Sequence, residues 1–175
     1  AETVPVEIVD SLNASLGLGF QALRAAALRD EGLDAATIAA RLREEVSTYH
    51  LLFFVETLEH LRRGGRIGKA ATMVGSLLQL RPLLRVDEGQ IVPFERTRTR
   101  RKALNALVDF AKGLSGVDVA AALYNTTPDD AATLASQIQV LTPEREVLIA
   151  QFSPVLGTHV GPGAVGLTVR ERPRG

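Results

Sequence analysis

The 175-residue sequence has no cysteine, no tryptophan and only one methionine. Without cysteine, disulfides, thiolate metal sites and cysteine nucleophiles are all excluded. No apolar run approaches the length of a membrane span, and the segment from Ala1 lacks the basic and then hydrophobic pattern of a secretory signal. We therefore expect a cytoplasmic protein without stable membrane insertion.

Signatures of catalysis are also missing. The sequence shows no nucleophile–base pair, no metal-ligand spacing and no paired carboxylates. The string RRGGRIGK (62–69) is not a phosphate-binding loop, because Arg63 and Ala70 occupy the places where such a loop needs Gly and Ser or Thr. We therefore expect a protein that is not an enzyme and that holds neither a metal nor a cofactor.

Basic residues, by contrast, are concentrated in one part of the chain. Between His60 and Lys102 there are eleven Lys and Arg against three Asp and Glu, so this segment carries +8. The whole chain contains 20 residues of each sign, so the remaining nine basic and seventeen acidic residues carry −8. This segregation indicates an anionic partner that meets one face of the molecule.

The first 48 residues have the pattern of a fragment of an α/β domain. The run VPVEIVD (4–10) predicts a short strand, and helices are expected over 15–31 and 34–46. Gly32 suits the position just after a helix, and Asp34 suits an N-cap. We expect residues 1–48 to form this partial domain and residues 49–175 to form a second one.

The second part alternates strands and helices and contains a hairpin signal at Asp87-Glu88-Gly89. Strands are expected over 49–56, 81–86, 90–97, 117–127, 146–156 and 164–169. Helices are expected over 57–63, 69–78, 99–114 and 128–140, and a glycine-rich loop over 157–163. The hairpin and the two-strand ending predict an α+β domain with a mixed or antiparallel sheet and helices on one side.

Five sequence blocks together resemble the DegV family of bacterial fatty-acid-binding proteins. In chain order they are VEIVDSLNASLGLGF, LEHLRRGGRIGKA, LLQLRPLL, GQIVPFERTRTRRKAL and GTHVGPGAVGL. The similarity covers nearly the whole chain. Members of the family begin with a Thr/Asp-Ser block and an SGTY-like segment, whose hydroxyls help to hold the lipid carboxylate. Neither is present before Ala1, so the chain resembles the second half to two-thirds of such a protein.

The resemblance implies a carrier of a long-chain fatty acid. In the family, one fatty acid lies in an apolar tunnel of the second domain, with its carboxylate at the domain junction. Some members present that carboxylate to a separate fatty acid kinase, which makes an acyl phosphate for phospholipid synthesis. A C16 tail at ~0.8 kcal/mol per buried methylene gains on the order of 10 kcal/mol, so the tail dominates the affinity. We expect a fatty acid as ligand and such a kinase as partner.

Four residues are candidates for the polar end of this site. Matched onto the family's block, His159 in THVGPG would bind the lipid carboxylate; satisfying a loop carbonyl is its alternative role. Ser11 ends the predicted strand and lies either near the head group or in a structural cap. Arg66 follows the Gly64-Gly65 helix stop and Arg98 ends a strand, and the resemblance places both on a basic face that meets the partner.

The tail is expected to lie against apolar residues of the segment around the helix predicted over 69–78. This segment has more apolar residues than one buried face needs, and methionine adapts well to an irregular cavity. The ordinary alternative is a place in the hydrophobic core. The candidates are Ile67, Met73, Val74, Leu77 and Leu78.

Other features of the chain leave alternatives open. His50 and His60 are expected to be structural, and Arg96, Arg100, Arg101 and Lys102 to be solvated charges. A nucleic-acid-binding protein that uses residues 96–102 is the rival function, but aromatic residues are not interleaved there. An unpaired strand at 4–10 and uncovered helix faces over 15–46 also favour association with a second copy of the chain, as a homodimer.

Overall fold

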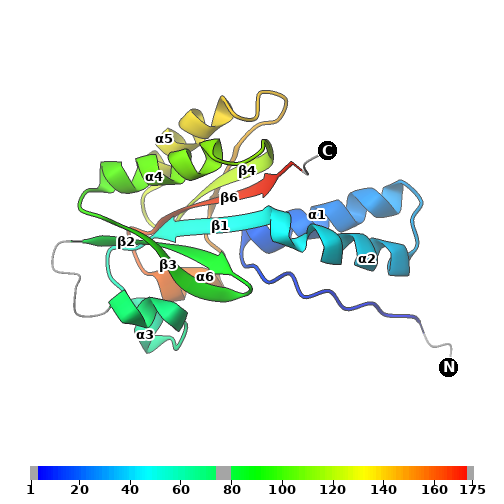
Figure 1. Ribbon diagram of the computed structural model, residues 1–175, viewed down its shortest axis with the longest axis horizontal. Helices are drawn as coiled ribbons and strands as arrows, with labels where there is room; N and C mark the ends of the chain where they lie inside the picture. Colours follow the sequence, from blue (N-terminus) through cyan, green and yellow to red (C-terminus); the bar gives the residue numbers. More distant parts are fainter. Residues whose placement is uncertain (1–3, 74–79, 173–175) are drawn as a thin grey trace.

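The computed structural model describes residues 4–73 and 80–172. The strands are β1 Tyr49–Phe54, β2 Arg81–Asp87, β3 Gln90–Thr97, β4 Val117–Tyr124, β5 Leu148–Gln151 and β6 Val165–Glu171. They form one six-stranded sheet in the order β3-β2-β1-β6-β4-β5 (Figure 1). Neighbouring strands are antiparallel except β4 and β5, which are parallel, so the sheet is mixed.

The helices begin where local sequence signals place them. Their bounds are α1 Leu16–Asp30, α2 Ala35–Glu45, α3 Glu59–Arg63, α4 Arg100–Lys112, α5 Pro128–Gln139 and α6 Pro154–Val160, with 3₁₀ turns η1 Val46–Thr48 and η2 Gly68–Met73. The Asp34 carboxylate accepts a hydrogen bond from the Thr37 backbone N–H at 2.8 Å and so caps α2. The Thr99 hydroxyl caps α4 in the same way, at 3.2 Å from the Lys102 nitrogen.

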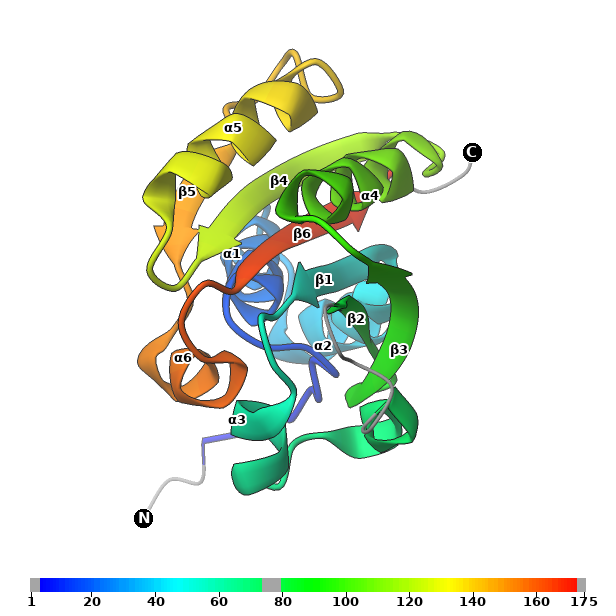
Figure 2. The same cartoon turned by 90° about the vertical axis from the view of Figure 1, so that its left-hand side faces the viewer.

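The two faces of the sheet carry separate hydrophobic clusters. Helices α4 and α5 cover the first face, where they pack on side chains such as Leu83 and Leu167. The second face is covered by α1, α3, α6 and η2, which pack around Leu51, Phe53 and Leu123. Figure 2 shows α4 and α5 on one side of the sheet and α3 and α6 on the other. The continuous apolar run of β1 is therefore buried on both faces, as predicted.

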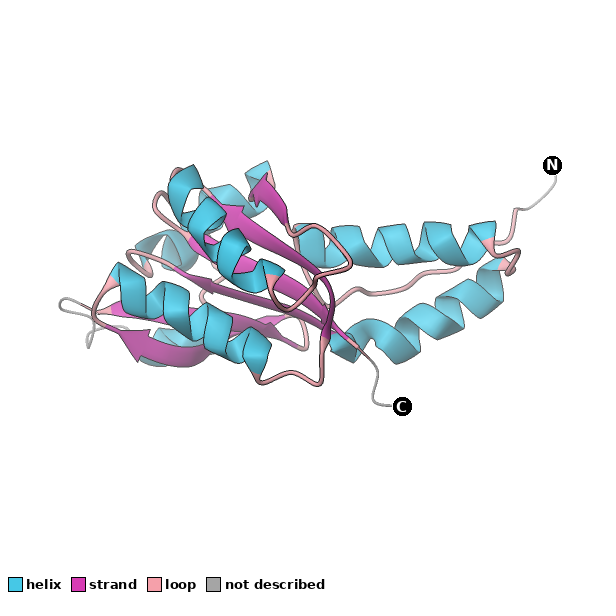
Figure 3. Cartoon of the chain, turned by 90° about the horizontal axis from the view of Figure 1, so that it is seen from above, coloured by secondary structure: helices cyan, strands magenta, loops and turns pink. Residues whose placement is uncertain are grey.

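Helices α1 and α2 form a hairpin that extends past one end of the sheet (Figures 1 and 3). Partly buried ion pairs attach it to the strands. Glu45 of α2 accepts from Arg24 of α1 at 3.0 Å and from Arg170 of β6 at 2.9 Å. Arg170 also pairs with Asp118 of β4 at 3.2 Å, so one chain of charges joins both helices to two strands.

The predicted α+β class with a mixed sheet is confirmed, but the structure corrects its details. Helices lie on both faces of the sheet rather than on one: α4 and α5 cover the first face, and α1, α3 and α6 cover the second. Residues 4–10 were predicted as a strand and are instead extended backbone outside the sheet. The Arg43 side chain donates to the Ile8 carbonyl oxygen at 2.8 Å. This backbone carbonyl is thus hydrogen-bonded to a side chain rather than to a neighbouring strand.

A second correction concerns residues 146–163. Only Leu148–Gln151 is a strand, and residues 154–160 form α6 rather than strand and loop. The Ser153 hydroxyl accepts from the Leu156 N–H at 3.4 Å and Pro154 is the first helical residue, a combination that starts helices. Of the helix predicted over 69–78, the structure describes only the 3₁₀ part, which ends at Met73. The division at residue 48 stays a prediction.

Among the residues that the structure describes, no helix combines the length and the hydrophobicity needed to cross a membrane.

Candidate functional site

Helices α3 and α6 pack against each other through two histidines and two glycines. The His159 ring, in the last turn of α6, fills the space that a Cβ atom at Gly64 would occupy. The His60 ring of α3 does the same at Gly161, the residue that ends α6 with φ +77°. Each helix therefore needs glycine at its end so that the ring of the other can approach its backbone.

The end of β4 holds α6 and the loop that follows it. The Asn125 side-chain amide donates to the carbonyl oxygens of Gly157 at 3.2 Å and Gly161 at 2.7 Å. The Gly163 N–H donates to the Thr126 hydroxyl at 2.9 Å. The sequence analysis missed Asn125 and Thr126, although polar residues directly after a buried strand are a signal that could have found them.

A cavity of about 620 Å³ lies beside this helix pair, and we call it the Arg66 cavity. Leu156, about one turn before His159 on α6, lines it together with Phe53 of the second face. The other lining residues come from the segment before α1, from the Gly64–Gly68 turn and from the β2–β3 hairpin: Asp10, Leu12, Asn13, Ala14, Gly65, Arg66, Gly68, Val86, Glu88, Gly89, Gln90 and Ile91. The cavity thus combines apolar lining residues with a polar rim, on which Arg66 is basic and Asp10 and Glu88 are acidic.

Two predicted polar residues lie at or next to this rim. The Arg66 side chain is exposed and donates to the Gly64 carbonyl oxygen at 3.1 Å. Ser11 lies between the lining residues Asp10 and Leu12, and its hydroxyl is 3.3 Å from the Asn13 carbonyl oxygen. The structure therefore places both beside the cavity, with His159 about one helical turn from its wall.

Arg98, by contrast, lies at the other end of β3. Gly68, two residues after Arg66, contacts Ile91 at the start of β3, whereas Arg98 directly follows its last residue, Thr97. Six residues of strand separate these points, which at ~3.3 Å per residue is roughly 20 Å. The two arginines therefore lie near opposite ends of β3, too far apart to bind one carboxylate together.

Of the four residues expected to be solvated charges, the structure corrects Arg100. It donates to Asp130 at 2.6 Å, to Glu56 at 2.6 Å and to the Thr127 hydroxyl at 2.7 Å, and it lies 5.1 Å from the centre of the Phe54 ring. Because Arg100 faces the protein, residues 96–102 do not form one continuous basic stripe for a nucleic-acid backbone. Arg96, Arg98, Arg101 and Lys102 are exposed.

The structure describes two of the candidate tail-lining residues, Met73 and Ile67. Met73 is fully buried in the second-face cluster with Ala70, and Ile67 packs against that cluster while partly exposed. Val74, Leu77 and Leu78 lie outside the described residues. Contact of any of these residues with a lipid stays a prediction.

The electrostatics of α3 reduce the positive charge near the cavity. Glu59 accepts hydrogen bonds from Arg62 at 2.9 Å and Arg63 at 2.7 Å, and these lower the pKa of its carboxyl to about 2. Both arginines are thereby paired, whereas Arg66 on the next turn makes its hydrogen bond to a backbone carbonyl. Across residues 4–73 and 80–172, no group of three or more His, Asp or Glu side chains is placed to hold a metal ion.

Comparison with known proteins gives a family match over nearly the full length. A family model described as "Uncharacterised protein, DegV family" matches residues 1–172. A DegV domain-containing protein of Streptomyces coelicolor is 38% identical over 175 aligned positions, and the alignment covers 97% of this chain and 61% of that protein. The chain thus spans about three fifths of the length of this relative.

Solved structures show the same arrangement of elements. A DegV family protein from Thermus thermophilus, described for its fatty acid binding, superposes with a TM-score of 0.82 at 34% identity. The match covers 95% of this chain and 61% of the other. DegV of Bacillus subtilis, described as a fatty acid binding protein, superposes with a TM-score of 0.79 at 36% identity. The match covers 93% of this chain and 59% of the Bacillus subtilis chain.

Proposed function

The chain belongs to the DegV family, and from this membership we propose that it binds a long-chain fatty acid as a carrier rather than as an enzyme. The observation that carries the proposal is the superposition, at 34% identity, on a Thermus thermophilus protein described for fatty acid binding. The Arg66 cavity supports it through its apolar lining residues, because they suit the hydrocarbon tail of such a ligand.

The tail supplies most of the affinity in this proposal. Burial of a C16 chain gains on the order of 10 kcal/mol at ~0.8 kcal/mol per methylene. Phe53 and Leu156 of the cavity, and Ile67 and Met73 beside it, provide apolar surface for the tail. Val74, Leu77 and Leu78 complete the proposed lining.

The head group is assigned to His159, with Ser11 as a second hydrogen-bonding group. The His159 ring is held against Gly64 and therefore has a fixed position near the cavity wall. A fixed imidazole binds a carboxylate without having to be ordered first, which reduces the entropic cost of binding.

Arg66 and Arg98 are assigned to a protein partner, a kinase that phosphorylates the bound carboxylate. Both side chains are exposed and they lie near opposite ends of β3, a separation suited to docking over a surface rather than to holding one head group. Replacement of either by Ala should slow transfer of the phosphoryl group while leaving lipid content nearly unchanged.

We further propose that the chain pairs with a second copy of itself. Residues 4–8 are extended and present Val4, Val6 and Ile8 at 78%, 78% and 82% exposure. Extended backbone with exposed β-branched side chains is suited to pairing with another strand.

Lipid extraction and native mass spectrometry of the purified chain test the main proposal. We expect close to one fatty acid per chain, and after lipid removal a saturable titration with palmitate. His159→Ala should weaken binding of palmitate, whereas His50→Ala should not, because His50 lies on β1 beside Glu171 at 3.3 Å. A chain that purifies without lipid and does not take up palmitate would exclude the proposal.

A further inference from the structure

The helix α6, which carries His159, is hydrogen-bonded to the side chain of Asn125. The helix has seven residues, and isolated helices shorter than ~12 residues are marginal in water. The Asn125 amide donates to the carbonyl oxygens of Gly157 at 3.2 Å and Gly161 at 2.7 Å. These acceptors lie two residues before and two residues after His159. One amide therefore spans the turn of α6 from which the imidazole projects.

Asn125 is itself fixed to the sheet through its backbone. It directly follows β4, and its N–H donates to the Ala164 carbonyl oxygen at 3.0 Å. Its own carbonyl oxygen accepts from the side-chain amide of Gln151, the last residue of β5, at 2.8 Å. Asn125 is thus bonded to the end of β5 and to the residue before β6. A side chain on such a rigid support fixes what it binds.

Two contacts together locate the His159 imidazole. The ring lies against the backbone of Gly64 in the turn after α3, and the helix backbone that carries the ring is bonded to Asn125. The first contact limits how close the ring comes to α3, and the second fixes α6 relative to β4. Hydrogen bonds extend to about 3.2 Å, so a shift of the imidazole by ~1 Å would lose its bond to a carboxylate.

We propose that Asn125 is a positioning residue for the head-group site. It holds the turn of α6 so that the His159 imidazole meets the carboxylate of the ligand. The inference rests on the proposed function, in which His159 binds that carboxylate. Asn125 acts through His159 and not on the ligand, because its amide has two donor hydrogens and two carbonyl oxygens already accept from that amide. It also does not line the Arg66 cavity.

Binding of palmitate and of 1-hexadecanol to the lipid-free chain tests the proposal. The two ligands have tails of equal length, but 1-hexadecanol has no carboxylate. Asn125→Ala should weaken palmitate binding about tenfold, as loss of a hydrogen bond to a charged group does, and leave the affinity for 1-hexadecanol unchanged. In a His159→Ala background, Asn125→Ala should cause no further loss of palmitate affinity. Loosened packing alone would weaken both ligands in both backgrounds.

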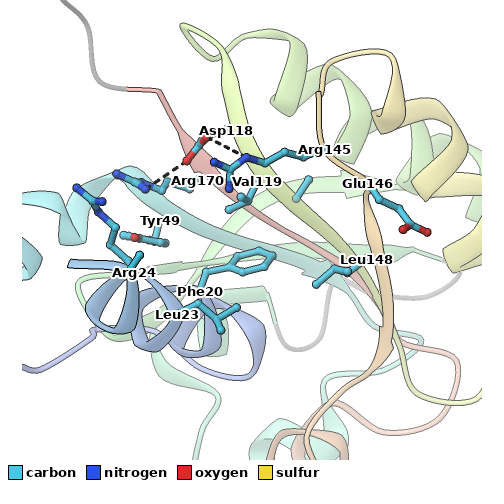
Figure 4. Close-up of a pocket in the computed structure, with 12 residues that line it drawn as sticks. Phe20, Leu23, Arg24, Tyr49, Asp118, Val119, Arg145, Glu146, Leu148 and Arg170 are labelled. Atoms are coloured by element: carbon cyan, nitrogen blue, oxygen red, sulfur yellow. Dashed lines mark hydrogen bonds and ion pairs between the residues drawn. The ribbon is translucent and has the colours of Figure 1, made fainter. Parts of the chain in front are cut away.

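Asp118→Ala is the matched control, because Asp118 lies at the opposite end of β4 from Asn125. Figure 4 shows its carboxylate paired with Arg170 at 3.2 Å and with Arg145 at 3.8 Å. Loss of these pairs removes polar contacts from the same strand but away from α6, so the affinity for palmitate should not change. An equal loss of palmitate affinity in Asp118→Ala and Asn125→Ala would overturn the proposal.

NMR of the imidazole C–H groups gives a readout that needs no ligand. Asn125→Ala should shift the His159 resonances and leave those of His50 in place, and unchanged His159 resonances would overturn the proposal. Asn125→Gln keeps the amide on a longer side chain and serves as the second variant where Asn125→Ala does not fold. It should weaken palmitate binding to a smaller extent.

The outcomes separate this inference from the proposed function. Wild-type palmitate affinity in both Asn125 variants, or an equal loss for palmitate and 1-hexadecanol, would overturn the positioning role and leave fatty-acid binding intact. A wild-type chain that binds neither ligand would overturn both proposals.

Discussion

At the scale of single residues, the contact between His159 and Gly64 links the packing of α3 and α6 to the proposed head-group site. Gly64 has φ −78°, which any residue can adopt, so glycine is required there by the His159 ring rather than by the backbone. The position of the imidazole and the absence of a side chain at residue 64 therefore depend on each other.

Gly64→Ala should destabilise the protein by about 1 to 3 kcal/mol, as overpacking of a close contact does. The cost should largely disappear in a His159→Ala background, because the methyl group then occupies the space of the ring. Denaturant unfolding of the two single variants and the double variant measures this coupling.

Gly113→Ala is the control for this cycle. Gly113 also ends a helix at φ −78°, but the nearest atom to an added Cβ is the Phe110 carbonyl oxygen at 3.4 Å. An equal cost of Gly64→Ala with and without the His159 ring would show that the ring does not set the requirement for glycine.

At the scale of elements, helix starts were predictable because their signals are local. Asp34, Thr99 and Pro128 stand at or next to the observed starts of α2, α4 and α5. The Ser153-Pro154 pair carries the same kind of signal for α6, and the apolar run before it concealed that signal. The strand predicted over residues 4–10 failed for a different reason: a strand needs a neighbour, and the apolar pattern does not reveal whether one exists.

The Arg100 cluster joins four elements around the loop that follows α6. Glu56 follows β1 and also pairs with Arg81 of β2 at 3.1 Å, while Asp130 belongs to α5. A Cβ at Gly163 would contact the Glu56 side chain, so this cluster borders the loop 161–163. Asp130 and Glu56 are 30 and 44 positions from Arg100 in the sequence, so local sequence spacing could not predict this cluster.

Arg100→Ala should lower the free energy of unfolding by about 1 to 3 kcal/mol, because Asp130 and Glu56 lose charged hydrogen bonds in a partly buried setting. Amide hydrogen exchange at Gly163 should become faster, since the adjoining loop loses support. Arg101→Ala, at the exposed neighbouring position, is the matched control. Equal effects of the two variants would contradict a specific role for the cluster.

At the scale of the whole molecule, the class of fold followed from the alternation of elements, whereas the site did not. Sequence blocks indicated His159, Ser11 and Arg66, and the structure places all three in or near one region. The other residues that line the cavity are brought together by packing of the β2–β3 hairpin against the segment before α1. This contact joins segments that are far apart in the sequence, and hydrophobic periodicity does not encode such contacts.

The same segment before α1 leaves an apolar surface on the outside of the molecule. A groove of about 620 Å³ runs between α1, α2 and residues 7–9, lined by apolar side chains that include Val9, Ile38 and Leu42. The exposed Val4, Val6 and Ile8 belong to the same extended segment. Pairing of this region between two copies would cover both features.

We expect the mass measured by light scattering to rise with protein concentration toward that of a dimer. Val6→Glu combined with Ile8→Glu should keep the chain monomeric, because charges at these positions would oppose strand pairing. Val140→Glu is the control, since Val140 is 77% exposed at the end of α5 and far along the chain from this segment. A wild-type chain that stays monomeric across the series, or an equal effect of Val140→Glu, would show that residues 4–8 do not mediate association.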